Sequence, residues 1–162
     1  MDIYALPSWH EDLSSQIPAA RLLMALGWHY LTPAEALELR EGKRGRAVLT
    51  GVLEPWLREH NAIEFKGQRV PFSDANIRKA VDALFNEPYD GPIVTNQRIY
   101  ERLTLGISLP QAVGGDTKSF TLHYVDWEHP ERNVFHVTEE FEIERRGSHP
   151  SKRSGTRRPD LV

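Results

Sequence analysis

The sequence predicts an α+β protein, because the spacing of its apolar residues changes part-way along the chain. In segments such as residues 73–86, apolar residues recur at the three-to-four-residue spacing of an amphipathic helix. After Gly114-Gly115-Asp116 they alternate with polar residues, which is typical of strands. We therefore expect one domain with a mainly helical part, about residues 1–115, followed by a strand-rich part, about residues 116–162.

Composition places the chain among ordinary globular proteins. It has 162 residues, of which 40% are hydrophobic and 27% charged, enough for a substantial core. No apolar run approaches the roughly 18 residues of a membrane span, and no cationic region precedes an apolar stretch at the N-terminus. We therefore expect a cytoplasmic protein with no membrane partner. The absence of cysteine excludes disulfides and thiolate chemistry, and no HExxH zinc motif occurs.

The first predicted helix ends near Gly27. Ser8 and Glu11 have the spacing of a capping box, in which each side chain bonds the backbone N–H of the other residue. Pro18 lies inside the helical pattern, so it either kinks this helix or begins its main segment. Both interpretations stay open.

Further helices are predicted on the same grounds, at about residues 33–40, 47–60, 73–86 and 91–105. Thr32 and Glu35 suit the cap and first turn of the first of these. Lys66-Gly67-Gln68 predicts the turn of a small hairpin between residues 63–65 and 69–72.

Two strands are predicted in the second part. Phe120, Leu122 and Tyr124 alternate with polar residues up to a turn at residues 128–131. From Val134 the alternation resumes, with Phe135, Val137, Phe141 and Ile143 on an expected buried face and His136, Thr138, Glu140, Glu142 and Glu144 on the other. We interpret the acidic second face as solvated, because like charges at alternate positions need water.

A basic segment follows these strands. Between Arg145 and Pro159 the chain has no acid and six cations, which are Arg145, Arg146, Lys152, Arg153, Arg157 and Arg158. The rest of the chain contains the other 14 of the 20 cations and all 23 acids, so its net charge is −9, whereas that of the whole chain is −3. These six cations are candidates for contacts with DNA phosphates. A solvated linker is the alternative, and both interpretations stay open.

Asp160 is the candidate catalytic residue. Pro159 fixes the entry to a strand, and Leu161-Val162 continue it with two apolar residues. A carboxylate on a strand beside a basic loop suits metal-dependent attack on a phosphodiester, since hard cations such as Mg²⁺ prefer carboxylate oxygens. The alternative is structural, because Pro-Asp is also a common turn pair.

With these motifs, the chain resembles the N-terminal endonuclease region of the R (restriction, or motor) subunit of type I restriction-modification enzymes. The resemblance covers essentially the whole sequence. It rests on the order and spacing of the stretches SWHEDL (8–13), LGWHY (26–30), LTLG (103–106), GDTKSF (115–120), YVDWEHPERN (124–133), FHVTEEF (135–141) and RRPDLV (157–162).

The resemblance implies an incomplete restriction-endonuclease-like core of the PD-(D/E)xK type, with antiparallel strands. In such cores one strand carries an aspartate and the next a Glu-x-Lys triplet that helps to bind Mg²⁺. Asp160 matches the aspartate as catalytic residue and metal ligand, whereas the triplet is expected beyond Val162. Glu11 matches an acidic position that can approach the metal, although a capping role explains it equally well.

The resemblance also implies partners and cofactors of the parent protein. These are double-stranded DNA, the methylation and specificity subunits, and ATP in translocase domains; no GxxxxGK[ST] motif occurs here. We expect the chain alone to be inactive, because the Glu-x-Lys half of the site is missing. The alternative function is a non-catalytic DNA-binding or subunit-docking module with a degenerate nuclease core.

Overall fold

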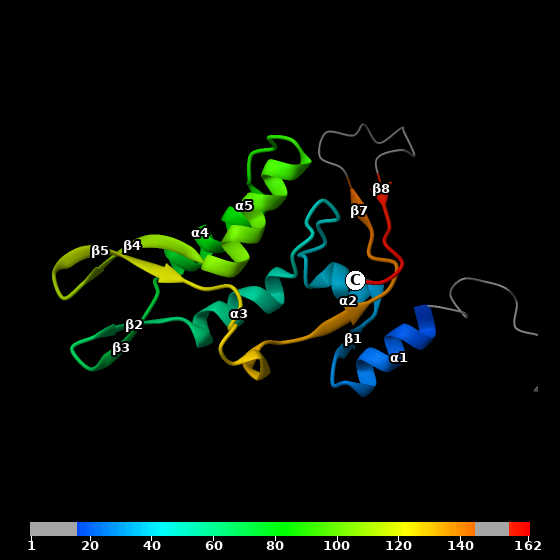
Figure 1. The fold of residues 1–162 in the computed structure, drawn as a ribbon, viewed down its shortest axis with the longest axis horizontal. Coiled ribbons are helices and arrows are strands. Elements are labelled where there is room, and N and C mark those ends of the chain that lie inside the picture. Colours follow the sequence, from blue (N-terminus) through cyan, green and yellow to red (C-terminus); the bar gives the residue numbers. More distant parts are fainter. Residues whose placement is uncertain (1–15, 145–155) are drawn as a thin grey trace, which may run out of the picture. The chain divides into compact units, whose positions relative to one another are not determined.

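The computed structural model describes residues 16–144 and 156–162 and shows helices and strands interspersed along the chain (Figure 1). The α+β class predicted from the sequence is confirmed. Among the described residues, no helix is long and apolar enough to cross a membrane. In chain order the elements are α1 (Ile17–Ala25), β1 (His29–Leu31), α2 (Pro33–Glu38), α3 (Thr50–His60), β2 (Ala62–Phe65), β3 (Gln68–Pro71), α4 (Asp74–Phe85), α5 (Pro92–Leu105), β4 (Ile107–Val113), β5 (Asp116–Leu122), a 3-10 helix (Pro130–Arg132), β6 (His136–Thr138), β7 (Ile143–Glu144) and β8 (Thr156–Arg157).

The chain forms two compact units. The first unit comprises Met1–Glu38, Gly42–Arg46 and Val134–Val162. The second unit comprises Leu39–Glu41 and Ala47–Asn133. The first unit therefore contains segments from both the N-terminal and the C-terminal part of the sequence, and the second unit consists mainly of the middle part.

Strand β6 is the centre of the first unit. On one side it pairs with β1 in parallel, with Tyr30 beside Val137. On the other side it pairs with residues 160–162, because Thr138 and Val162 exchange two backbone hydrogen bonds of 2.9 Å each. The expectation of antiparallel strands is thus wrong for β1 and β6. A parallel pair needs a long connection, and here the whole second unit lies between the two strands in sequence.

The predicted alternation along residues 135–143 holds only in part. Val137 and Phe141 are buried, but the Phe135 side chain is 43% exposed and Thr138 is buried. Phe135 precedes β6 and its ring lies 5.3 Å from that of Trp28. Thr138 is covered because its backbone is hydrogen-bonded between two neighbouring segments. The alternation ends where Glu140 adopts a φ of 53°, so the residues beyond it no longer follow the pleat of β6.

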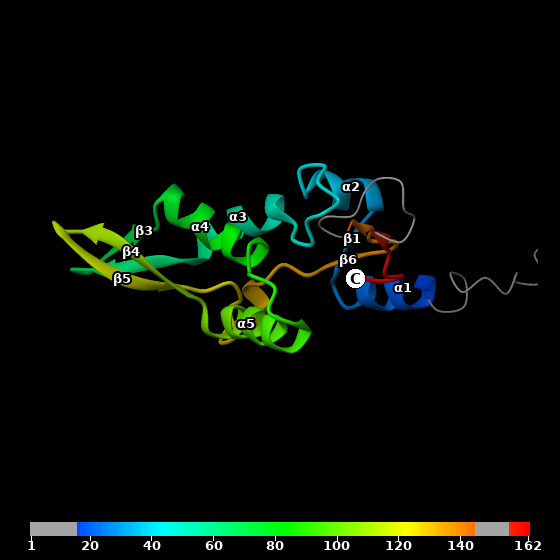
Figure 2. The same ribbon diagram turned by 90° about the horizontal axis from the view of Figure 1, so that it is seen from above.

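The core of the second unit lies among two hairpins and helices α3 and α4. Figures 1 and 2 both show β2–β3 beside β4–β5. Leu57, Ile77 and Leu122 are fully buried in this core. At the β4–β5 turn Gly114 has a φ of 65°, and the ring of Phe65 packs so closely that an added Cβ would lie 2.2 Å from its Cζ. Only glycine fits both constraints.

Helix α5 is tied to the end of α4 by ion pairs. It has no buried residue, whereas the Glu87 side chain, just after α4, is only 5% exposed. Arg102 Nη2 lies 2.5 Å from Glu87 Oε2, and Arg98 Nη1 lies 3.5 Å from Glu87 Oε1. Arg102 also donates a hydrogen bond to the carbonyl of Ala83. A largely desolvated carboxylate thus anchors the helix, in addition to the packing of Leu103 against the core.

Several local predictions are confirmed. The cap on α2 forms as expected, since Thr32 Oγ1 donates to Glu35 Oε2 at 2.7 Å and accepts from Glu35 N at 3.3 Å. Ser73 caps α4 by accepting from Asn76 N at 3.3 Å. Within the described residues, Pro18 lies in the first turn of α1. The Ser8 cap lies outside the described residues.

Strand β4 was not predicted from the sequence. Pro110 lies in its middle, opposite Ser119 of β5, and proline is uncommon within strands because it cannot donate a ladder hydrogen bond. In the described sheets β4 pairs only with β5. No described strand lies along the other edge of β4, so the missing N–H of Pro110 breaks no hydrogen bond there.

Two leucine-to-alanine substitutions test this packing. Leu57→Ala removes a side chain that is fully buried in the second unit and should lower the free energy of unfolding by about 2–5 kcal/mol. Leu105→Ala makes the same chemical change at an exposed position and should change it by about 0.5 kcal/mol or less. Urea denaturation followed by circular dichroism measures both. Similar losses for the two variants would contradict the assignment of the core.

Candidate functional site

The predicted site residues fall into two groups. Asp160, Arg157 and Arg158 lie in the described part of the first unit. The others lie outside the described residues, namely Glu11, Arg145, Arg146, Lys152 and Arg153. The geometry below therefore concerns the end of the chain and the strands that it contacts.

Asp160 is positioned by its backbone. Its carbonyl oxygen accepts a hydrogen bond from Glu140 N at 3.2 Å, and the next residue, Leu161, forms a bridge with Glu139. The Asp160 side chain is exposed, and among the described residues its carboxylate forms no hydrogen bond or ion pair. With respect to the described residues, the Asp160 carboxylate is therefore accessible to a ligand.

Glu140 is the acidic neighbour of Asp160 across this pairing. The backbone register sets the two residues opposite each other, and the φ of 53° at Glu140 means that its side chain does not follow regular strand geometry. Glu140 forms an ion pair with Nε of Arg158. Sequence reasoning placed Glu140 on a solvated face, because only the register of residues 138–140 with 160–162 reveals its position.

A second polar contact ties β1 to the end of β6. The Tyr30 hydroxyl donates a 2.8 Å hydrogen bond to Oε1 of Glu139. This bond raises the pKa of Tyr30 above its usual range, and burial and the Glu139 charge act in the same direction. Tyr30 therefore stays protonated and continues to orient Glu139.

Two histidines face each other across β1 and β6. The rings of His29 and His136 are 5.9 Å apart and nearly perpendicular. Burial lowers the pKa of His136, and the neighbouring His29 lowers it further. Glu35 lies nearby in sequence, and its hydrogen bonds from Thr32 lower the pKa of its carboxyl.

The described residues do not fit a complete magnesium site. Mg²⁺ requires near-octahedral oxygen ligands and gives up its waters reluctantly. Among residues 16–144 and 156–162, no three His, Cys, Asp or Glu side chains gather closely enough to hold a metal ion. Asp160 offers one unpaired carboxylate, and Glu140 is already engaged by Arg158.

The histidine pair generates a pH prediction. A histidine with a lowered folded-state pKa favours the neutral form, so its contribution to stability is present above the unfolded pKa of about 6.5 and is lost as pH falls through the folded pKa. We expect an NMR titration of His136 to have a midpoint below about 6.5. His29→Ala should raise that midpoint only part of the way, because burial is the larger cause.

A His136 midpoint at or above about 6.5 would contradict the burial of this imidazole beside His29.

Comparison with protein families gives one match. The family model of the type I restriction enzyme R protein N terminus matches residues 9–162. Comparisons with curated proteins and with solved structures found no match. The matched range includes both units and extends through Asp160 to Val162.

Proposed function

Since the chain belongs to the family of type I restriction enzyme R protein N termini, we propose that it supplies the first part of the DNA-cleaving site of an R subunit. The reaction is hydrolysis of a phosphodiester of double-stranded DNA. The observation that carries the proposal is the position of Asp160, an exposed carboxylate that pairs with no described residue and whose backbone is hydrogen-bonded to the segment after β6. A carboxylate whose backbone is already held in place loses little conformational entropy when it binds a metal ion.

The charges around Asp160 support a phosphate substrate. Arg157 and Arg158 are exposed and directly precede the Pro159-Asp160 pair. Guanidinium groups bind phosphate oxygens through fixed pairs of N–H donors, and such contacts position DNA without reading its sequence. The remaining cations of the basic segment would extend this contact. ATP hydrolysis, translocation and the choice of target site are proposed for other domains and subunits of the complete enzyme.

A second candidate function is a subunit-docking module with a degenerate nuclease core. The ion pair of Glu140 with Arg158 favours it, because it neutralises the described acid that lies opposite Asp160 in the backbone register. In that case the role of Asp160 would be structural, as a residue of the turn that begins at Pro159.

Replacing Asp160 in the complete R subunit separates the two functions. Asp160→Asn keeps the shape of the side chain and removes its charge. We expect DNA cleavage with Mg²⁺ and ATP to fall by at least about 100-fold, since even outer-shell partners of metal ligands contribute 10–100-fold. ATPase activity and translocation should be unchanged, because the motor is not touched.

Glu144→Gln, at an exposed position on β7, is the matched control and should cleave normally. The 162-residue chain alone should show no Mg²⁺-dependent cleavage. Normal cleavage by Asp160→Asn would refute the catalytic role, whereas loss of ATPase in the folded variant would indicate a structural one.

Salt dependence tests the DNA contact. Binding of the chain to duplex DNA should be weak, indifferent to sequence and steeply dependent on salt, with a log-log slope of about −0.9 for each phosphate contacted. Arg157→Gln should weaken binding and reduce the slope by about 0.9. Arg158→Gln should have a smaller effect, since Glu140 already holds that guanidinium.

Arg69→Gln, an exposed cation on β3 of the second unit, is the control for a change in net charge. An unchanged affinity and slope in Arg157→Gln would show that the basic segment is a solvated linker.

A further inference from the structure

The second unit contains a cavity far in sequence from Asp160. It has a volume of about 380 Å³ and lies among the C-terminal end of α3, the end of α5 and the loop after β5. Its size falls within the range of ordinary ligand sites. The lining residues are Trp56, His60, Asn61, Thr104, His123, Val125, Asp126, Trp127 and Glu128.

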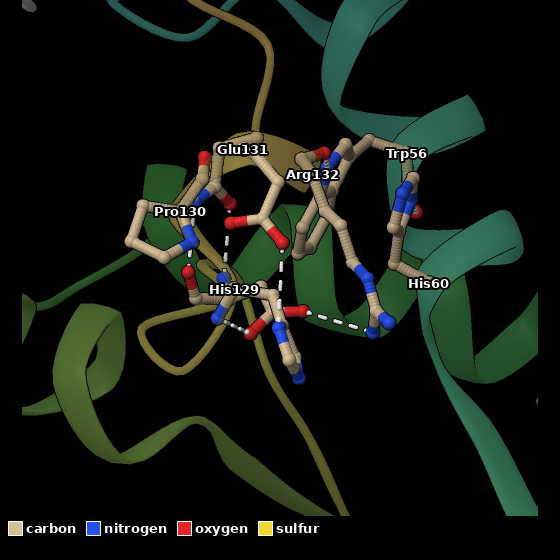
Figure 3. A network of polar contacts seen from close by, with 8 residues as sticks. Trp56, His60, His129, Pro130, Glu131 and Arg132 are labelled. Carbon is tan, nitrogen blue, oxygen red and sulfur yellow. Dashed lines mark hydrogen bonds and ion pairs between the residues drawn. The ribbon is translucent and has the colours of Figure 1, made fainter.

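Aromatic rings form its walls. Trp56 and His60 stack with their ring centres 4.7 Å apart and their planes 8° from parallel, as both side chains project from α3 (Figure 3). The indole N–H of Trp56 donates to the carbonyl of Arg132 at 3.0 Å. On the outer side, Trp127 is 60% exposed and its indole N–H donates to the carbonyl of Leu103 at 3.2 Å. Both indole donors are thus used within the protein, and Trp127 is the indole that remains largely exposed to a ligand.

The charge of the lining is negative. Among the described residues, no lysine or arginine lines the cavity, whereas Asp126 and Glu128 do. Asp126 accepts a hydrogen bond from His129 N at 2.9 Å, which is the main reason that its pKa is lowered, and it lies 3.5 Å from Arg132 Nη1. Glu128 is exposed, and its carboxylate forms no ion pair with a described residue. The free charge at the opening is therefore that of Glu128.

Two large exposed apolar side chains lie on α5 on the helix face that includes Thr104. Thr104 lines the cavity, and Tyr100 and Ile93 follow at spacings of four and seven residues, which places them on nearly the same helix face. The Tyr100 side chain is 67% exposed and that of Ile93 is 80% exposed. Large exposed apolar residues beside a pocket are typical of protein-binding surfaces.

We propose that this surface docks a partner protein that inserts an arginine side chain into the cavity and lays apolar residues along α5. A guanidinium group is planar, stacks on indole faces, and donates hydrogen bonds to carboxylates, so it matches both the walls and the charge. Tryptophan, tyrosine and arginine are also the residues that dominate binding energy at protein interfaces. A nucleotide is disfavoured, because its phosphate would approach the exposed Glu128, and the nearby Arg132 is already paired with Asp126. The proposal concerns the second unit and does not depend on the nuclease activity.

The test uses the 162-residue chain and two peptides. The probe is acetyl-Leu-Arg-Leu-amide, and its control carries citrulline, which keeps the shape of arginine without the charge. We expect the arginine peptide to shift the NMR signal of the Trp127 indole N–H saturably, and the citrulline peptide to bind at least about fivefold more weakly. Glu128→Gln should weaken binding of the arginine peptide by about fivefold, which corresponds to about 1 kcal/mol.

Glu131→Gln is the matched control, because Glu131 belongs to the same loop but does not line the cavity. Its affinity for the arginine peptide should equal that of the unchanged protein. Three results would overturn the proposal: no saturable shift with the arginine peptide, equal binding of the citrulline peptide, or unchanged binding by Glu128→Gln. Saturable binding of deoxyadenosine monophosphate at Trp127 in place of the peptide would assign the cavity to nucleic acid instead.

Discussion

The two backbone hydrogen bonds between Thr138 and Val162 determine where the carboxylate of Asp160 lies. They set the register in which residues 160–162 run beside β6, and that register brings Asp160 opposite Glu140. Strand β6 is in turn held by β1, whose residues lie more than 100 positions away in the sequence. A side chain at the end of the chain therefore depends on contacts with its beginning. Loosening β1 would move Asp160 without touching any residue near it in sequence.

Local signals in the sequence were sufficient for much of the fold. The cap at Thr32, the start of α4 at Ser73 and the β2–β3 turn at Lys66-Gly67 each depend on residues within one or two turns of each other. Such patterns fix their own hydrogen bonds, so no tertiary contact is needed to recognise them. Asp160 could be singled out for the same reason, from the short motif around it.

The features that the sequence did not predict all depend on distant partners. Strand register, which no local pattern encodes, determines three of these features. They are the parallel pairing of β1 with β6, the burial of Thr138 and the position of Glu140 opposite Asp160 in the backbone pairing. Helix α5 is a related case. Its spacing predicted a helix correctly, but its attachment through Arg98 and Arg102 to the buried Glu87 carboxylate is a tertiary ion pair. The cavity at Trp56 and Trp127 likewise joins segments about 70 residues apart.

The ion pair between Arg158 and Glu140 gives the two described arginines of the basic segment different roles. A phosphate that approached Asp160 would compete with Glu140 for the guanidinium of Arg158. If Arg158 turned to the phosphate, Glu140 would lose its only described cation and would stand opposite Asp160 as a second bare carboxylate. Two such carboxylates repel each other unless a cation joins them. In the proposed nuclease, DNA binding at this edge would therefore strengthen the local demand for a divalent cation, which couples substrate and metal through one arginine.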